Sequence, residues 1–246
     1  MVLYHRPGYY DDEASTPTPP PFSPDDLTGL RVWLDASTLA LAHGAEVTSW
    51  PDLSGNGKNF GAVAGTAPAF QAAGQNGLGT VRFTTGKAMA TATNPQTGAS
   101  AGTLVTVQKS TADPQTSPAA VGALVSKWGS HGGVDFQPYE DGLIYHGWGS
   151  TVRKTVGNPP ATLAAFRVHV MTTAAGAWRY HLDGGSPFHT AAGNVVGWFA
   201  GVVSLGAWHG DACEVVAYDR VLPAADLNQV GDYLAAKWGV TWSPVS

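Results

Sequence analysis

The chain has 246 residues, of which 43% are hydrophobic and only 13% are charged, and its net charge is −5. Average domains carry roughly 25% charged residues, so polarity here depends on uncharged side chains, which suit hydrogen bonding to sugars. The longest basic cluster is Arg153-Lys154 and no apolar run approaches ~20 residues, which argues against nucleic acid binding and membrane insertion.

The chain begins with an arm, residues 1–24, that precedes the first strand pattern. Its Pro-rich part, residues 16–24, favours extended polyproline II at about 3.1 Å per residue. The part before it gathers aromatic and basic side chains of the kind favoured at interfaces. These candidate docking residues are Tyr4, His5, Arg6, Tyr9 and Tyr10. The arm therefore predicts docking into a partner; a disordered leader is the alternative.

Processing signals and cysteine content are also informative. The segment 1–7 has no apolar stretch of the kind found in a secretory signal peptide, which predicts synthesis in a cytoplasm. Cys213 is the single cysteine, so no intrachain disulfide is expected. We expect Cys213 to be a small buried hydrophobic residue.

Short strand patterns follow the arm, each four to seven residues long and rich in β-branched or aromatic side chains. They cover residues 30–35, 80–84, 104–107, 122–126, 142–145, 166–171, 178–182, 202–206 and 213–218. Turn signals separate them, at residues 52–57, 76–77, 141–142 and 183–185. Many strands without intervening helices predict a single all-β domain over residues 25–246.

A helix is predicted at the end of this domain, over residues 223–238. Its apolar residues recur at intervals of three and four, and Gly239 follows as a C-cap. These apolar residues are Leu227, Val230, Leu234 and Trp238. We expect this stripe to cover one edge or end of the sandwich, with Val240 and Trp242 packing back onto it.

Several motifs together resemble the laminin-G-like, or concanavalin A-like, jelly-roll domains. The motifs lie at residues 30–36, 47–57, 68–70, 76–77, 81–83, 214–222 and 237–239. The likeness covers about residues 27–240, with specific ends and a loose middle, and its closest pattern is that of tailed-phage virion proteins and bacterial surface proteins. It implies a jelly-roll sandwich with one short C-terminal helix, extended at the N-terminus by the arm.

The chain lacks the paired carboxylates of glycoside hydrolases and the histidine motif of zinc hydrolases. A glycoside hydrolase needs two carboxylates facing one groove, whereas the adjacent Glu140 and Asp141 would face opposite sides of a strand and instead indicate a turn. The zinc-binding motif His-Glu-x-x-His does not occur. The sequence therefore predicts that the chain is not an enzyme and has no cofactor.

Calcium is the one metal that the resemblance implies, held at the rim of the sandwich. Asp52 and Asp183 lie at loop positions and are its weak candidates. Calcium prefers six or more oxygen ligands, and acidic residues are sparse here.

Aromatic residues beside glycines between residues 127 and 149 give the best indication of binding. Such glycines can leave ring faces open for sugars to stack on, while nearby polar side chains bind hydroxyl groups. The candidate glycan-binding residues are Trp128, His131, Asp135, Tyr139, His146 and Trp148. The alternative is that Trp128 and Trp148 are ordinary core or rim residues.

These observations lead to a prediction of function. We expect a phage virion structural protein, such as a minor tail protein, an appendage or a head-decoration protein. Its arm would dock to other virion proteins or to copies of itself, and its jelly roll would contact host-surface glycans. The alternative is a free carbohydrate-binding or adhesion module.

Overall fold

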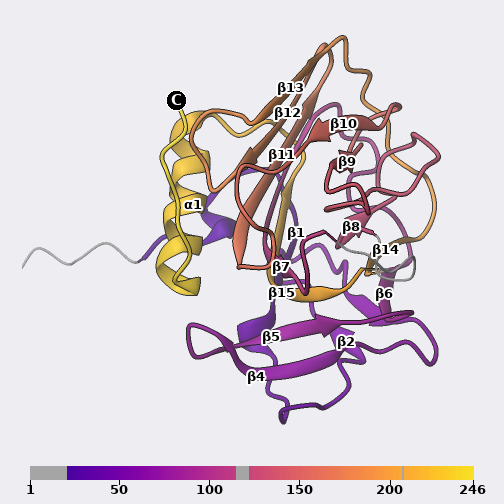
Figure 1. Cartoon of the computed structure of the whole chain (residues 1–246), viewed down its shortest axis with the longest axis vertical. Helices are drawn as coiled ribbons and strands as arrows, with labels where there is room; N and C mark the ends of the chain where they lie inside the picture. The colour runs from indigo at the N-terminus through magenta and orange to yellow at the C-terminus, as the bar shows by residue number, and fades with distance from the viewer. Residues whose placement is uncertain (1–20, 115–121, 207) are drawn as a thin grey trace, which may run out of the picture.

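The computed structural model describes residues 21–114, 122–206 and 208–246. Within these residues two antiparallel sheets pack face to face, and one α-helix covers the outside of the larger sheet (Figure 1). The all-β sandwich predicted from the sequence is confirmed. The five candidate docking residues of the arm lie outside the described residues, so docking remains a prediction.

The larger sheet has the strand order β13-β12-β11-β7-β15-β5-β4, and β1 also pairs with β15. The strands are β1 (Leu30–Asp35), β4 (Ala69–Gln75), β5 (Leu78–Phe83), β7 (Gly102–Ser110), β11 (Arg167–Ala174), β12 (Ala177–Leu182), β13 (His189–Ala192) and β15 (Gly210–Tyr218). A bulge between Ala212 and Glu214 divides β15, so that β5 pairs with its first part and β1 with its second. The strand β15 thus connects β5 and β1 within one sheet.

The smaller sheet has the strand order β2-β3-β6-β14-β8. Its strands are β2 (Ser49–Trp50), β3 (Phe60–Ala62), β6 (Ala88–Thr91), β8 (Val125–Ser126) and β14 (Val203–Gly206). A separate two-stranded ribbon joins β9 (Ile144–His146) and β10 (Lys154–Gly157). Two short 3-10 helices, η1 (Pro24–Asp26) and η2 (Ala36–Thr38), flank β1.

Two hydrophobic clusters share the larger sheet. One fills the space between the sheets and includes Trp50, Phe83 and Trp178, all fully buried. The other lies between the outer face and the helix and includes Val170 and Val216. Because both faces are covered, β15 is buried along its whole length. Cys213 is buried on this strand as a free thiol, as expected.

The helix α1 (Ala224–Trp238) confirms the sequence prediction closely. It follows Pro223 and ends at Gly239, whose φ of 62° is left-handed. Its apolar stripe covers the face of the larger sheet, whereas an edge or end was expected. Val240 and Trp242 pack against the same cluster. Among the described residues, no helix has the length and apolarity that a bilayer crossing requires.

The last residues assigned to the arm contact the folded body. The Phe22 ring packs edge-on against Tyr233 of α1, with ring centroids 6.1 Å apart. Buried Pro24 accepts a hydrogen bond at its carbonyl from the Tyr218 hydroxyl, at 2.9 Å. Phe22 and Pro24 are therefore packed against the sandwich.

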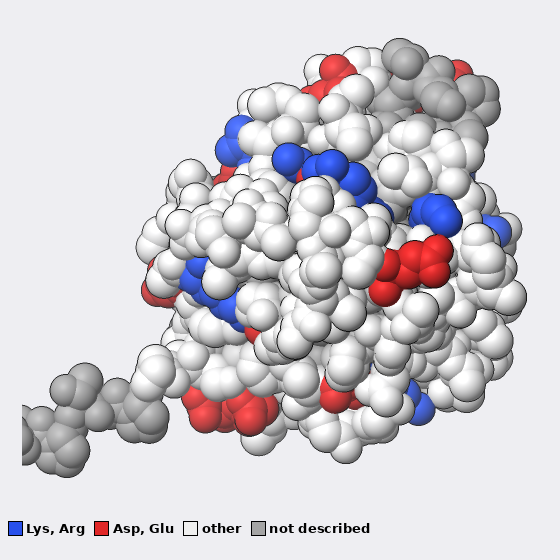
Figure 2. Space-filling model, turned by 90° about the horizontal axis from the view of Figure 1, so that it is seen from below, with Lys and Arg blue, Asp and Glu red and all other residues white. Residues whose placement is uncertain are grey.

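The surface matches the low charge of the sequence. Figure 2 shows one face on which Lys and Arg form small separate groups, several of them beside acidic groups, on an otherwise uncharged surface. The turn from β15 into α1 is closed by ion pairs, Arg31 with Asp219 and Arg220 with Asp226, at 2.7 and 2.8 Å.

Candidate functional site

The segment 134–157 forms a small aromatic surface beside β9 and β10. Figure 1 shows these two strands on the side of the sandwich away from α1. Tyr145 is central in β9: its backbone exchanges two hydrogen bonds with Phe136, at 2.7 and 3.0 Å, and it pairs with Thr155 on the other side. This pairing fixes the Phe136 and Tyr145 side chains next to each other.

An aromatic pocket of about 380 Å³ opens on this surface. We use the name for the space lined by Phe136, Tyr139, Tyr145 and Arg153. The three rings are half-buried and meet at steep angles, with centroid separations of 4.7 to 6.4 Å. Rings fixed in this way offer apolar faces and edges to a ligand without first having to be ordered.

Polar groups border the aromatic pocket. The Arg153 guanidinium lies 5.2 Å from the Phe136 ring centre and 5.6 Å from that of Tyr145, and it donates to the Val134 carbonyl at 2.6 Å. The Tyr145 hydroxyl donates to Asp141 at 2.6 Å. This hydrogen bond raises the pKa of Tyr145 and lowers that of Asp141. The pocket thus combines a cation and three rings, one of which is bonded to an anion beside it.

A buried carboxylate, that of Asp135, supports the loops beneath the pocket. Its Oδ1 accepts from the Gly147 backbone N–H at 2.7 Å and lies 3.2 Å from Nε2 of His131. Burial works to raise the pKa of Asp135, but His146, His131 and the Gly147 hydrogen bond together lower it. Burial lowers the pKa of His146. Asp135, His131 and His146 therefore support the site from within.

The two predicted tryptophans are not exposed. Trp128 is fully buried and stacks on Phe60 at 5.9 Å with an interplanar angle of 7°. Trp148 is fully buried and meets Trp198 edge-on at 4.9 Å. Their ring faces are covered by other side chains, so a sugar cannot stack on them. The alternative interpretation, that both are core residues, agrees with this burial.

Of the predicted glycan-binding residues, Tyr139 is the one that lines the aromatic pocket. Sequence reasoning missed Phe136, Tyr145 and Arg153. The alternation of side chains along a strand was an available signal for Tyr145. Its neighbours Ile144 and His146 are both buried in the structure, so the side chain between them points the other way. Tyr145 then faces outward between them, and Phe136 and Arg153 are placed by pairing and long-range contact.

The calcium candidates do not fit a cation. Both carboxylate oxygens of Asp52 accept hydrogen bonds, from the backbone N–H groups of Trp33, Ser54 and Lys58 and from the Ser54 hydroxyl. Asp183 accepts from the Val168 N–H and pairs with Arg167 at 2.8 Å. Donors and a guanidinium occupy the positions that calcium would take. Among the described residues, no group of three or more His, Cys, Asp or Glu is arranged to hold a metal ion.

Comparison with known proteins shows the class of fold. In sequence, the chain matches no protein-family model and no curated protein. In structure, it is similar to Trypanosoma rangeli sialidase in complex with sialic acid, with 14% identity and a TM-score of 0.58 over 86% of this chain. It is also similar to the botulinum neurotoxin serotype D binding domain, with 11% identity and a TM-score of 0.60 over 88% of this chain. At these identities the likeness shows the fold, a β-sandwich of the jelly-roll kind.

A third similar structure is a mutant of a GH54 α-L-arabinofuranosidase soaked with an arabinofuranoside, with 15% identity and a TM-score of 0.53 over 78% of this chain. The chain spans 33% of the sialidase, 54% of the neurotoxin domain and 51% of the arabinofuranosidase. Two of these three structures are of enzymes. This finding overturns the prediction, made from missing motifs, that the chain is not an enzyme, because the same fold occurs within enzymes.

Proposed function

We propose that this chain is a carbohydrate-binding module that recognises glycans through the aromatic pocket. The observation that carries the proposal is the surface cluster of Phe136, Tyr139 and Tyr145, bordered by Arg153. Sugar rings present C–H faces that pack on aromatic side chains, and their hydroxyl groups bind charged and polar groups at the rim.

Two further observations support this proposal. Arg153 lines the pocket as a donor, and Asp141, bonded to the Tyr145 hydroxyl, is an acceptor next to a lining residue, as a polyhydroxylated ligand requires. Among the similar folds are a sialidase crystallised with sialic acid and an arabinofuranosidase soaked with an arabinofuranoside. Carbohydrate chemistry thus occurs in proteins that contain this kind of sandwich.

A glycan array with the full chain tests the proposal. We expect the wild type to bind a subset of glycans and Tyr139→Ala to reduce the affinity for them about tenfold, since an aromatic anchor contributes more than 1 kcal/mol. The matched control is Phe199→Ala, because Phe199 is also a surface aromatic, 46% exposed, but lies outside the pocket. An array without any bound glycan, or an equal loss in both variants, contradicts the proposal.

We further propose the broader setting expected from the sequence, display of this module on a phage virion. Two features of the sequence support it: the resemblance of its motifs to those of tailed-phage virion proteins, and the aromatic and basic residues of the arm. Deletion of residues 1–20 tests it, because the cut leaves Phe22 and Pro24 in their contacts with the body. We expect the truncated protein to fold, with an unchanged Tm, but not to enter particles. Normal incorporation would exclude docking through the arm.

A further inference from the structure

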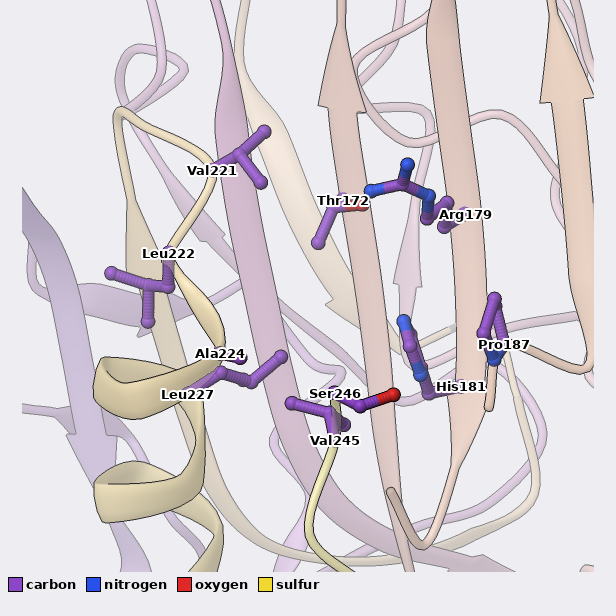
Figure 3. Close-up of a pocket in the computed structure, with 10 residues that line it drawn as sticks. All are labelled: Thr172, Arg179, His181, Pro187, Val221, Leu222, Ala224, Leu227, Val245 and Ser246. Carbon is purple, nitrogen blue, oxygen red and sulfur yellow. The ribbon is translucent and has the colours of Figure 1, made fainter. Parts of the chain in front are cut away.

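A second cavity, of about 280 Å³, lies between the outer face of the larger sheet and the first turn of α1 (Figure 3). Its polar wall consists of Thr172 from β11 and of Arg179 and His181 from β12. Thr172 and Arg179 are direct partners in the strand register. The facing wall includes the apolar Leu222, Leu227 and Val245, and Ser246 lies beside Val245 in the same lining. None of these residues belongs to the aromatic pocket.

Arg179 stands apart from the other arginines that the structure describes. No carboxylate of the described residues pairs with it, and no hydrogen bond to it is formed within them. The others are engaged: Arg31, Arg82, Arg167 and Arg220 pair with carboxylates, and Arg153 binds the Val134 carbonyl. A guanidinium with free donors beside a cavity is suited to a carboxylate or another oxyanion.

The buried polar groups of the same wall also lack a complete set of partners. Thr172 is only 5% exposed, and within the described residues its hydroxyl makes no hydrogen bond. His181 is 6% exposed; its Nδ1–H donates to the Gly185 carbonyl at 3.0 Å. That bond leaves Nε2 of the neutral ring as an acceptor. Neither Thr172 Oγ1 nor His181 Nε2 is among the fully enclosed unpartnered polar atoms, and both residues line the cavity, so a ligand with hydroxyl groups can reach them there.

The first turn of α1 adds a positive end to the cavity. Pro223 precedes the helix and provides no side-chain cap, so the first amides have no acceptor within the helix. Ala224 and Leu227 of this turn line the cavity. Asp226, the acid of the same turn, is paired with Arg220 at 2.8 Å. Helix N-termini of this kind favour anions.

We infer that this cavity binds a sugar acid, a monosaccharide that carries a carboxylate. The carboxylate would bind Arg179 and the first amides of α1, and a hydroxyl group would donate to His181 Nε2. The carbon skeleton would pack on Leu222 and Leu227. This inference does not rest on glycan binding in the aromatic pocket, because the two sites share no residue.

Titration of the isotope-labelled full chain with D-glucuronate, followed by NMR, tests the inference. We expect saturable shifts of the backbone amides of Thr172, His181 and Ala224. Neutral D-glucose should leave these signals in place. Inorganic sulfate should move them more weakly, because it lacks hydroxyl groups and a carbon skeleton; sulfate binding as tight as glucuronate binding would contradict the sugar-acid assignment.

Substitutions complete the test. Arg179→Gln should weaken glucuronate binding at least tenfold, and Thr172→Val, which keeps the shape but removes the hydroxyl, several-fold. Arg153→Gln is the matched control in the aromatic pocket and should leave these shifts unchanged. Absence of shifts in the wild type, or wild-type affinity in Arg179→Gln, would overturn the inference. Because Arg153→Gln alters the aromatic pocket alone, it distinguishes loss of glucuronate binding at Arg179 from loss of glycan binding in the aromatic pocket.

Discussion

A single buried carboxylate, that of Asp135, joins three loop segments beneath the aromatic pocket. Its Oδ1 accepts from Gly147 at 2.7 Å, and its Oδ2 accepts from the Lys127 N–H at 3.2 Å. The backbone N–H of Asp135 donates to the Ser126 hydroxyl at 3.0 Å. Because Phe136 follows directly in the chain, these bonds set the position of one wall of the pocket. Asp135 therefore acts on ligand binding through the placement of other residues.

Asp135→Asn is expected to destabilise the fold by about 1 to 3 kcal/mol. The carboxylate accepts from the N–H groups of Gly147 and Lys127. An asparagine has only one acceptor oxygen, so its NH₂ group would face one of these two N–H groups and leave it without a partner. Urea unfolding of both proteins measures the change. Asp141→Asn is the matched control, because Asp141 is exposed, and should change stability by less than about 0.5 kcal/mol. Equal unfolding midpoints for wild type and Asp135→Asn would contradict the supporting role of this carboxylate.

At the scale of the elements, α1 is fixed by a close approach that only glycine permits. A Cβ atom on Gly231 would lie 2.0 Å from the Trp242 ring. The C-terminal segment also bonds to the turn after β12, where the Ser243 N–H donates to the Asp183 carbonyl at 2.9 Å. Trp242 is thereby held against the helix, and the helix against the larger sheet.

Gly231→Ala separates helix propensity from packing, because the two have opposite signs. Alanine favours an isolated helix over glycine by about 0.5 to 1 kcal/mol. Displacing the Trp242 ring should outweigh this gain and lower the free energy of unfolding by about 1 to 3 kcal/mol.

The Trp242→Ala background provides the control. There Gly231→Ala should be stabilising, and thermal unfolding of the four proteins forms the cycle. Destabilisation of similar size in both backgrounds would exclude the Trp242 contact as the cause.

Long elements with strong periodicity were predictable from the sequence. The helix and β1 were predicted to within one residue, because each shows its period several times. The strands β2 and β3 were missed, since two or three residues cannot show alternation. The same limit applied to the site: Tyr139 was predicted, but the exposure of Tyr145 and the burial of Trp148 depend on what covers each ring. Only the folded chain determines that.

At the scale of the whole molecule, a chain of buried polar groups crosses the inner face of the larger sheet. Gln108 of β7 donates to Gln137 at 3.2 Å, and Gln137 donates to the Tyr180 hydroxyl of β12 at 2.6 Å. That hydroxyl lies 2.6 Å from Nδ1 of His169 on β11. The Tyr180 hydroxyl can accept from Gln137 and donate its proton to His169 Nδ1, and in this arrangement Nδ1 is unprotonated. Burial, which lowers the pKa of His169, favours such a neutral histidine in the interior.

Acid should weaken the fold through this histidine. Burial lowers the pKa of His169 from 6.5 to about 3, so between these pH values the unfolded chain binds a proton that the folded protein does not. The free energy of unfolding should thus fall as the pH drops below about 6.5, and the loss should grow down to about pH 3. Urea unfolding at a series of pH values measures this slope. His169→Gln removes one of the buried histidines whose pKa is lowered and should make the slope shallower, while His146 and His181 retain part of it. His43→Gln, at an exposed histidine, is the control variant. A slope that is the same in all three proteins would show that acid acts elsewhere.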